Sequence, residues 1–378
     1  MESIYLDYNA TTPIDREVAD AMQPYLYEFF GNPSSTHSFG IITKEAVNIA
    51  RKQMASLINA HSSEIIFTSG GTESNNYAIK GVAFANKEKG NHIITSQIEH
   101  PAVTEVCKFL EENGFQVTYL PVDEYGMVNP MDVKNAITPQ TILVSIMHAN
   151  NEVGTIQPIQ KIGEITRKNN ILFHTDAAQS LGKIEVDVND LNVDLLSVAG
   201  HKLYAPKGIG ALYVKSGTKL KKLIHGADHE MNQRAGTENV LEIVGLGKAC
   251  EIANRDMAKN CLHLKKMRNK LQAILLESIP EARINGHPEF QLPNTLSISF
   301  PTIEANTLLA QLPHVAASAG AACHTGSVSI SSVLKAMNVP LEFAMGTIRL
   351  STGKYNSSDE IEKAGRFIIN AVKKTGPM

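Results

Sequence analysis

The chain has 378 residues, 43% hydrophobic and 19% charged, with a formal net charge of −3. This length fits two domains or one large α/β domain with an appendage, and the charge shows no bias toward nucleic acid or anionic membranes. No run reaches the length of a membrane span and the N-terminus carries no signal-peptide pattern, so we expect no membrane partner and no direct nucleic-acid partner. Four scattered cysteines argue against a disulfide framework or a zinc site, which favours a reducing cytoplasm and no metal.

Short apolar runs alternate with helix-period stretches through the first half of the chain. The runs are dense in Ile, Leu and Val without strict alternation, as strands buried on both faces should be. They cover residues 64–69, 91–96, 141–147, 170–176, 194–200 and 210–214. The helical patterns between them cover residues 73–87, 101–114 and 158–170. This alternation predicts an α/β fold with a mainly parallel sheet covered by helices.

The pattern changes after about residue 238. A long helical stretch runs to about 279, interrupted near its start by Gly245 and Gly247, and we expect it to bridge two domains. A smaller α+β unit follows, with elements at 294–300, 304–312, 331–337, 346–351 and 358–374. We predict a large domain of residues 15–255 and a small domain made of 1–14 and 256–378. The small domain contains a stretch of small residues, about 318–330, around Cys323.

Two strand ends carry groups that suit an anionic, aromatic ligand. In "FTSGGTESNN", Gly71 and Thr72 lie where a strand passes into a helix, and free N–H groups there can bind a phosphate. An ordinary helix start explains that pattern equally well. Asp176 ends another buried strand, where a carboxylate could pair with a cationic ring nitrogen. Taken alone, Asp176 fits a helix-capping or turn role better.

Two further junctions carry a lysine and histidines. In "AGHKLYAPKGIGALYV", Lys202 follows a buried strand, and burial there would lower its pKa and leave a nucleophilic amine. The alternative is an ordinary solvated loop lysine. His201 beside it is ambiguous alone, and His100 could stack on a planar ring or be structural. One explanation unites the four motifs, since a phosphate cradle, a carboxylate, a lysine and a stacking histidine together suit pyridoxal 5′-phosphate (PLP).

The chain resembles the NifS/IscS-like cysteine desulfurases, which are PLP enzymes of the aminotransferase class V group with fold type I. The matching motifs run nearly end to end and include "YLDYNATTP", "GNPSSTHSFG", "EHPAV", "HANNEVGTIQPI", "HTDAAQ", "RAGTENV" and "RLSTGKYN". Selenocysteine lyases belong to the same superfamily and share most of them. The resemblance implies a large domain with a seven-stranded type of sheet, a smaller α+β domain, and a homodimer.

The resemblance also assigns roles by position. It implies that Lys202 binds PLP as a Schiff base, that His100 stacks on the ring and assists proton transfer, and that Arg349 clamps the substrate carboxylate. The residues implied to contact the cofactor are Gly71, Thr72, His100, Asp176 at the ring nitrogen, Gln179 at the phenolic oxygen, His201, Lys202 and, from the second subunit, Thr237. The residues implied to bind the substrate are Ala10, Thr11, Asn151 and Arg349.

Cys323 gains a function from the same resemblance. In the family a thiolate attacks the sulfur of PLP-bound cysteine, alanine leaves, and a persulfide remains on the enzyme. The small residues around Cys323 suit a thiol that travels between the cofactor and a protein acceptor. The other three cysteines, Cys107, Cys250 and Cys261, lie within helical patterns and are expected to be structural.

Three departures from the family pattern affect the interpretation. Ala199 stands where many members have a serine that contacts the phosphate, so Ser197 or water would have to substitute. The segment 227–232 lacks the usual Gly and Arg residues, and we expect it near the active-site entrance. The cysteine stretch reads "GAACHT", which also resembles selenocysteine lyases.

The leading hypothesis is therefore a PLP-dependent cysteine desulfurase. It would convert L-cysteine to L-alanine and supply sulfur for iron–sulfur clusters, thiolated tRNA or another thio-cofactor. The alternatives are a selenocysteine lyase, which forms alanine and selenide from L-selenocysteine, and a non-catalytic scaffold with the PLP fold. Retention of Lys202, Asp176, His100, Arg349 and Cys323 together argues against the scaffold.

Overall fold

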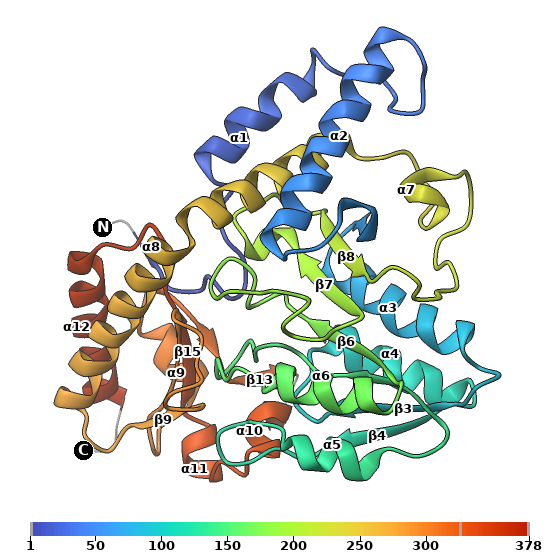
Figure 1. The fold of residues 1–378 in the computed structure, drawn as a ribbon. Helices are drawn as coiled ribbons and strands as arrows, with labels where there is room; N and C mark the ends of the chain where they lie inside the picture. The colour runs from blue at the N-terminus through green and yellow to red at the C-terminus, as the bar shows by residue number, and fades with distance from the viewer. Residues whose placement is uncertain (1–2, 325–326, 376–378) are drawn as a thin grey trace.

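The structure is a computed structural model that describes residues 3–324 and 327–375. The side chains of residues 321–329 lie outside this description. Two units lie side by side and are joined by a long helix, α8, which runs diagonally across the molecule (Figure 1). In the part of the chain that the structure describes, no helix has the length and apolar character needed to cross a membrane.

A seven-stranded sheet forms the centre of the larger unit. Its strand order is β2-β8-β7-β6-β5-β3-β4, and all pairings are parallel except the two that β8 makes with β2 and β7. The strands are β2 Ile65–Thr68, β3 His92–Ser96, β4 Gln116–Leu120, β5 Thr141–Ser145, β6 Leu172–Asp176, β7 Leu195–Ala199 and β8 Gly210–Val214. The predicted α/β fold with a mainly parallel sheet is confirmed.

Helices cover both faces of this sheet because neighbouring residues of each strand point in opposite directions. Ile93 and Leu195 join the cluster under α3 and α4, whereas Ile94 and Leu196 join the cluster under α2, α6 and α8. The helices of this unit are α1 Arg16–Met22, α2 Ser38–Leu57, α3 Gly71–Ala85, α4 Pro101–Glu112, α5 Pro130–Ala136, α6 Ile159–Lys168, α7 His229–Asn232 and α8 Val240–Ser278, with short 3₁₀ helices η1 Gln23–Leu26, η2 Ser62–Glu64 and η3 Gly200–Lys202.

The smaller unit is built on a four-stranded antiparallel sheet of order β12-β15-β10-β9. The N-terminal strand β1 pairs in parallel with β11, and Ile4 and Leu6 enter the core of this unit beside α12 and the C-terminal half of α8. The elements are β1 Ile4–Tyr5, β9 Arg283–Asn285, β10 Thr295–Ser299, α9 Ala305–Ala310, β11 Val315–Ala316, β12 Ser318–Ala319, β13 Ala321–His324, β14 Ser327–Ile330, α10 Ser332–Ala336, α11 Leu341–Ala344, β15 Thr347–Ser351 and α12 Ser358–Thr375.

The helix α8 runs without a break through Gly245 and Gly247, so the predicted interruption is wrong. The two glycines instead allow close packing. A Cβ atom at Gly245 would lie 2.7 Å from the Met22 sulfur, and one at Gly247 would lie 2.5 Å from the Cα of Ala50. The two glycines therefore let α8 pack closely against α1 and α2. Helix propensity, which disfavours glycine in a helix interior, does not predict this packing.

The edge strand β4 (Gln116–Leu120) was not among the predicted strands. It reads "QVTYL" and is mostly half-exposed, because it pairs on one side only, with β3. A strand at the edge of a sheet lacks the continuous apolar run of a doubly covered strand. The rule that found the central strands therefore missed this one.

Candidate active site

The candidate site is a cavity of about 320 Å³ at the carboxyl edge of the large sheet. The carboxyl ends of parallel strands meet at this edge, where ligands bind in open α/β folds. The structure brings together ten of the residues predicted from the sequence. They are Ala10, Gly71, Thr72, His100, Asn151, Asp176, Gln179, His201, Lys202 and Arg349.

Lys202 ends η3, the short turn that follows β7. Its Nζ atom donates to two backbone carbonyls of the N-terminal segment, to Asn9 at 2.5 Å and to Ala10 at 2.7 Å. Burial and, to a lesser extent, the positive charge of Arg349 together lower the pKa of Lys202 to about 8. A substantial fraction of the amine is thus neutral near pH 8, as a lysine nucleophile requires.

Asp176 is the last residue of β6, and its carboxylate is held on both oxygens. Oδ2 accepts a hydrogen bond from Asn75 Nδ2 at 2.6 Å, and Oδ1 accepts one from the backbone N–H of Ala178 at 2.9 Å. Both partners are neutral, so no described residue forms an ion pair with this carboxylate. The other end of the Asn75 amide, Oδ1, is buried and without a hydrogen-bond partner among the described residues. Buried polar atoms are normally satisfied, so this atom beside the cavity indicates a site built for a polar ligand.

His100 is the N-cap residue of α4, with Pro101 directly after it. Its Nδ1 atom accepts the backbone N–H of Ala102 at 3.1 Å, which leaves Nε2 as the protonated nitrogen of a neutral ring. Burial lowers the pKa of His100, and Lys202 lowers it as well, against an opposing effect of Asp176. A neutral imidazole can stack on a flat ring and can accept or return a proton.

The start of α3 forms the predicted anion cradle. The N-cap residue is Gly70, which supplies no side chain to satisfy the first N–H groups of the helix. A Cβ atom at Gly71 would lie 3.1 Å from the Ala199 methyl group, so a larger residue would crowd the floor of the cradle. The uncapped N–H groups and the positive end of the helix dipole suit a phosphate.

His201 lies beside this cradle and is bonded to Thr11, whose Oγ1 atom is 3.1 Å from His201 Nδ1. Burial and, to a lesser extent, the positive charges of Lys202 and Lys207 together lower the pKa of His201 to about 4. The ring is therefore neutral at pH 7. It can contact a phosphate as a hydrogen-bond donor rather than as a cation.

Arg349 reaches the cavity from β15 of the smaller unit. Its Nη1 atom donates to the carbonyl of Asn151 at 3.0 Å, and Nη2 donates to Asp7 at 2.8 Å and to Ser318 at 3.0 Å. Nε is buried without a partner among the described atoms. A planar guanidinium with an unused N–H group is suited to a two-point contact with a carboxylate.

Several predicted residues do not line the cavity. Ser197 is fully buried in β7 and its hydroxyl bonds to His174 Nε2 at 2.9 Å, so the structure does not support it as a substitute phosphate ligand. Thr11 touches His201 rather than the cavity itself. Thr237 is exposed on the loop before α8.

The segment 227–232 does not line the cavity, and its position near the entrance stays a prediction. Its Glu230 is buried and accepts two hydrogen bonds from Arg51 of α2, at 2.6 and 2.7 Å. Three successive residues, Glu230 to Asn232, have positive φ angles of 47°, 56° and 61°. Such left-handed backbone is costly for non-glycine residues, so the buried ion pair stabilises a strained turn.

The backbone of Cys323 lies in β13, which pairs with β14 as a two-stranded hairpin and places Cys323 opposite Val328. Its side chain is among those outside the described part of the chain, so its role stays a prediction. The hairpin is followed by α10, whose Val333 and Leu334 pack in one cluster with Met147, a residue that lines the cavity.

Two polar residues that line the site were missed by sequence reasoning. Asn9 is 1% exposed, and its carbonyl holds both Lys202 and Gln179, whose Nε2 donates to it at 3.0 Å. Asn75 orients Asp176. Both stand inside motifs that were recognised, "YLDYNATTP" and "FTSGGTESNN", but nothing in a single sequence indicates which asparagine faces the cavity.

The site residues fit PLP and define a class of protein. An uncapped helix start, a carboxylate without a countercharge, a lysine with a lowered pKa and a neutral histidine surround one cavity. The chain matches the aminotransferase class-V family over residues 4–364 and belongs to it. It is a PLP-dependent enzyme with the α/β fold of that family.

The relatives narrow this class further. The chain is 50% identical over 375 residues to the cysteine desulfurase IscS of Methanosarcina thermophila, covering 99% of this chain and 93% of the relative. Among solved structures it is similar to a NifS-like protein (TM-score 0.93, 39% identity, 98% and 100% of the two chains covered). It is also similar to SspA in complex with cysteine (TM-score 0.81, 38% identity, 94% and 100% covered). Within its family the chain therefore belongs to the cysteine desulfurases.

Proposed function

We propose that this chain transfers sulfur from L-cysteine to its own Cys323. In the balanced reaction, L-cysteine and the Cys323 thiol give L-alanine and a Cys323 persulfide. One observation supports this above the others. Lys202, Asp176 and His100 of the large unit meet Arg349 of the smaller unit around a single cavity.

The residues divide the work by position. When bound, PLP withdraws electrons from the amino acid attached to it and so weakens the bonds that break. The Asp176 carboxylate holds the ring nitrogen, and Gln179 contacts the phenolic oxygen. Arg349 and Asn151 bind the substrate carboxylate. Lys202 and His100, with pKa values lowered by burial, move protons at the substrate carbons.

Cys323 acts as the sulfur acceptor in this proposal. The hairpin that carries it begins one residue after β12, whose Ser318 bonds to Arg349, and is followed by Ser331, which bonds to Glu152 at 2.5 Å. Both ends of the hairpin are thus attached beside Arg349 and Asn151, the residues proposed to hold the substrate. The persulfide then passes to an acceptor protein for iron–sulfur clusters, thiolated tRNA or another thio-cofactor.

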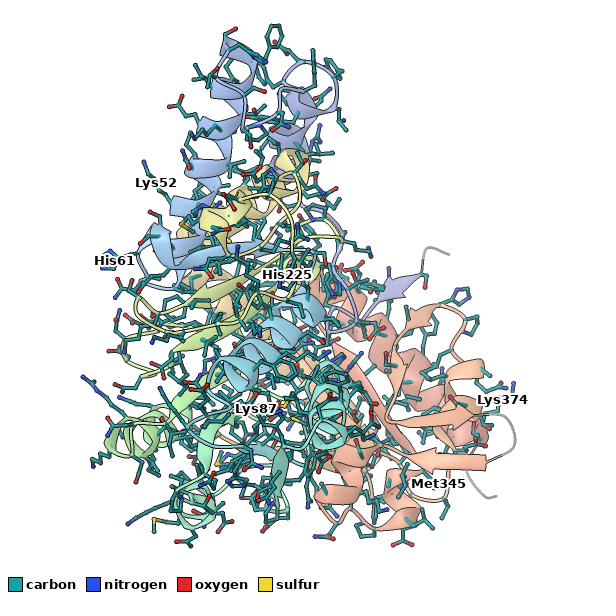
Figure 2. The ribbon with its side chains drawn as sticks, turned by 90° about the vertical axis from the view of Figure 1, so that its right-hand side faces the viewer. Lys52, His61, Lys87, His225, Met345 and Lys374 are labelled. Atoms are coloured by element: carbon teal, nitrogen blue, oxygen red, sulfur yellow. The ribbon has the colours of Figure 1, made fainter. Side chains whose placement is uncertain are left out.

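The chain works as a homodimer in this proposal, with Thr237 contacting the phosphate of the second subunit. The helices α1 and α2 project from the body of the larger unit in both views (Figures 1 and 2). In Figure 2, Lys52 of α2 lies far from Met345 and Lys374, which belong to the smaller unit on the opposite side of the view. The connection between α1 and α2 and the first turn of α2 carry exposed large apolar side chains, which are Leu26, Tyr27, Phe30, Phe39 and Ile41.

Apolar groups gathered on this projecting part of the chain indicate a protein partner, which we take to be a second copy. The Arg51–Glu230 ion pair ties α2 to the segment that leads to Thr237. A monomer in light scattering would contradict this assignment. We further propose a cytoplasmic location, supported by the free, buried thiols of Cys107 and Cys250.

The decisive experiment measures alanine released from L-cysteine and from L-selenocysteine, for the wild type and for Cys323→Ala. We expect the wild type to release alanine from cysteine and the variant to lose this activity. Cysteine turnover that survives in the variant would contradict the role of Cys323. A wild type that releases alanine only from selenocysteine would identify a selenocysteine lyase instead.

A further inference from the structure

Lys183 is a buried lysine behind the cavity that has no carboxylate partner among the described residues. Lys183 is 6% exposed and occupies the turn after β6 and Gln179. In the described part of the chain its ammonium has no carboxylate within ion-pair distance, and its hydrogen-bond partner is an amide oxygen. Burying a charge without a countercharge is costly, so a lysine in this position requires an explanation.

The contacts of Lys183 fix the orientation of Gln179. Lys183 Nζ donates to Gln179 Oε1 at 2.9 Å, and Gln179 Nε2 donates to the carbonyl of Asn9 at 3.0 Å. An ammonium group can only donate and a carbonyl can only accept. Rotating the amide by 180° would bring NH₂ against NH₃⁺ and oxygen against oxygen, so the orientation is set by chemistry from both ends.

This orientation leaves one N–H of Gln179 unused. The amide nitrogen carries two hydrogens, and the carbonyl of Asn9 takes one of them. Gln179 also lines the cavity, so the second hydrogen is available to a ligand there. Asn9 itself is held firmly, because its side chain bonds to Asn151, Thr295 and Asn294.

We propose that Lys183 is a positioning residue that holds the Gln179 amide with an N–H toward the phenolic oxygen of PLP. The proposal rests on the proposed function, because it requires PLP in this cavity. The positive charge behind the amide also polarises its N–H and favours a negative phenolic oxygen. Lys183 itself does not touch the cofactor and acts through Gln179.

The electrostatics of the cavity support this assignment. Burial, together with the positive charges of Lys202 and Arg349, lowers the pKa of Lys183 to about 7. The three basic side chains therefore repel one another when charged, and Lys183 is only partly protonated at neutral pH in the apo protein. An anionic cofactor and an anionic substrate would relieve this repulsion, which links the charge of Lys183 to an occupied site.

The test is a double-mutant cycle on PLP affinity. Apo protein is titrated with PLP, and the visible absorption of bound PLP gives the dissociation constant and the band position. We expect Lys183→Met and Gln179→Met each to weaken PLP binding by about tenfold and to shift the band. The double variant should bind PLP no more weakly than Gln179→Met alone, because both changes remove the same contact.

The control is Lys215→Met, which removes an exposed lysine that lies 3.9 Å from Asp194, a residue outside the cavity. It should leave PLP affinity unchanged. Additive losses in the double variant, or a folded Lys183→Met variant with wild-type affinity and band, would overturn the proposal. A wild type and control that take up no PLP would instead refute the proposed function.

A second variant keeps the proposal testable where Lys183→Met fails to fold. In Gln179→Glu both side-chain oxygens accept hydrogen bonds, so the carboxylate can pair with Lys183 but has no N–H for the cofactor. Both Gln179→Glu and Gln179→Met lose the hydrogen bond to the Asn9 carbonyl, and only the glutamate can still pair with Lys183. We therefore expect the apo melting temperature of Gln179→Glu to exceed that of Gln179→Met, and its PLP binding to be about tenfold weaker than that of the wild type. A melting temperature no higher than that of Gln179→Met would contradict the contact with Lys183, and unchanged PLP affinity would contradict the role of the N–H.

Discussion

The two walls of the cavity differ in how their charged side chains are held. On the wall formed by the large sheet, the described partners of Lys202 and Asp176 are all neutral, namely backbone carbonyls, a backbone N–H and the Asn75 amide. On the wall formed by the smaller unit, Arg349 is already paired with a carboxylate, Asp7, at 2.8 Å.

This difference in charge pairing affects the cofactor and the proposed substrate in different ways. Neutral partners orient the charges of Lys202 and Asp176 without cancelling them, so the cofactor meets a preorganised wall. The charge of Arg349 is cancelled in part by Asp7, so a substrate carboxylate bound there, as proposed, would have to compete with Asp7. Asp7 also accepts a hydrogen bond from Ser318 at 2.8 Å, at the base of the hairpin that carries Cys323. Under the proposed function, substrate binding at Arg349 would therefore act on contacts that reach that hairpin.

The largest expected effect comes from the cofactor wall. Lys202→Ala removes the amine and should reduce alanine formation from L-cysteine by about 10³-fold or more. Borohydride should trap PLP on the wild type and not on the variant, as mass spectrometry of the protein can measure. Retained turnover in the variant would overturn the PLP assignment.

The substrate wall should respond differently. Arg349→Lys keeps the charge but loses the planar, two-point contact, so we expect the KM for L-cysteine to rise by about tenfold to a hundredfold. PLP affinity, measured by titration of the apo protein, should stay unchanged. Arg255→Lys is the matched control, because Arg255 is exposed and bonds to Glu17, which is not among the residues lining the cavity. Equal losses of PLP affinity and of KM in Arg349→Lys would mean that the two walls do not act separately.

The cofactor wall could be predicted from the sequence because its residues follow from strand position. Asp176 and Lys202 end or follow apolar runs, and parallel strands bring such ends to one edge. The residues that hold Lys202 and Asp176 in place, Asn9 and Asn75, could not be predicted in this way. Asn9 lies 193 positions before Lys202, and Asn75 lies 101 positions before Asp176. Contacts over such separations depend on the folded chain and leave no local periodicity.

The role of Arg349 on the other wall was predicted only from the family resemblance. Arg349 sits in β15 without a motif that indicates a carboxylate clamp, and its partners come from three separate segments. Ser197 shows the opposite error. Its position two residues before Ala199 made it a plausible substitute, but its hydroxyl is already bonded to His174. A sequence shows which groups are near in the chain, whereas the structure shows which of them are still free to bind.

The lowered pKa of Lys202 gives a pH dependence with a defined sign. The amine must be neutral to attack PLP, so the rate of PLP attachment to the apo protein should rise about tenfold per pH unit below 8 and level off above it. Rapid mixing with detection in the visible range measures this rate. A rate independent of pH between 6 and 8 would contradict the lowered pKa.

The same shift predicts how the stability of the apo protein changes with pH. The pKa of Lys202 is about 8 in the folded chain, below the ordinary value of 10.5, so the unfolded chain binds more protons between these two values. The contribution of Lys202 to stability should therefore increase as the pH rises from about 8 to 10.5. Denaturant unfolding of the apo wild type and of Lys202→Met at several pH values isolates this contribution. A difference that falls over this range would contradict the assignment.

The smallest expected effect comes from changing Asp7, the carboxylate that distinguishes the Arg349 wall from the wall formed by the large sheet. In Asp7→Asn the side-chain oxygen can still accept from Arg349 and Ser318, so the geometry is kept while the negative charge is lost. The substrate carboxylate then meets an Arg349 with no competing anion, and we expect the KM for L-cysteine to fall by about threefold with kcat little changed. The same change should lower the pH at which PLP attachment levels off, because Asp7 raises the pKa of Lys202. A higher KM with an unchanged pH dependence would mean that the charge of Asp7 serves mainly to position Arg349. Its competition with the substrate would then be the weaker effect.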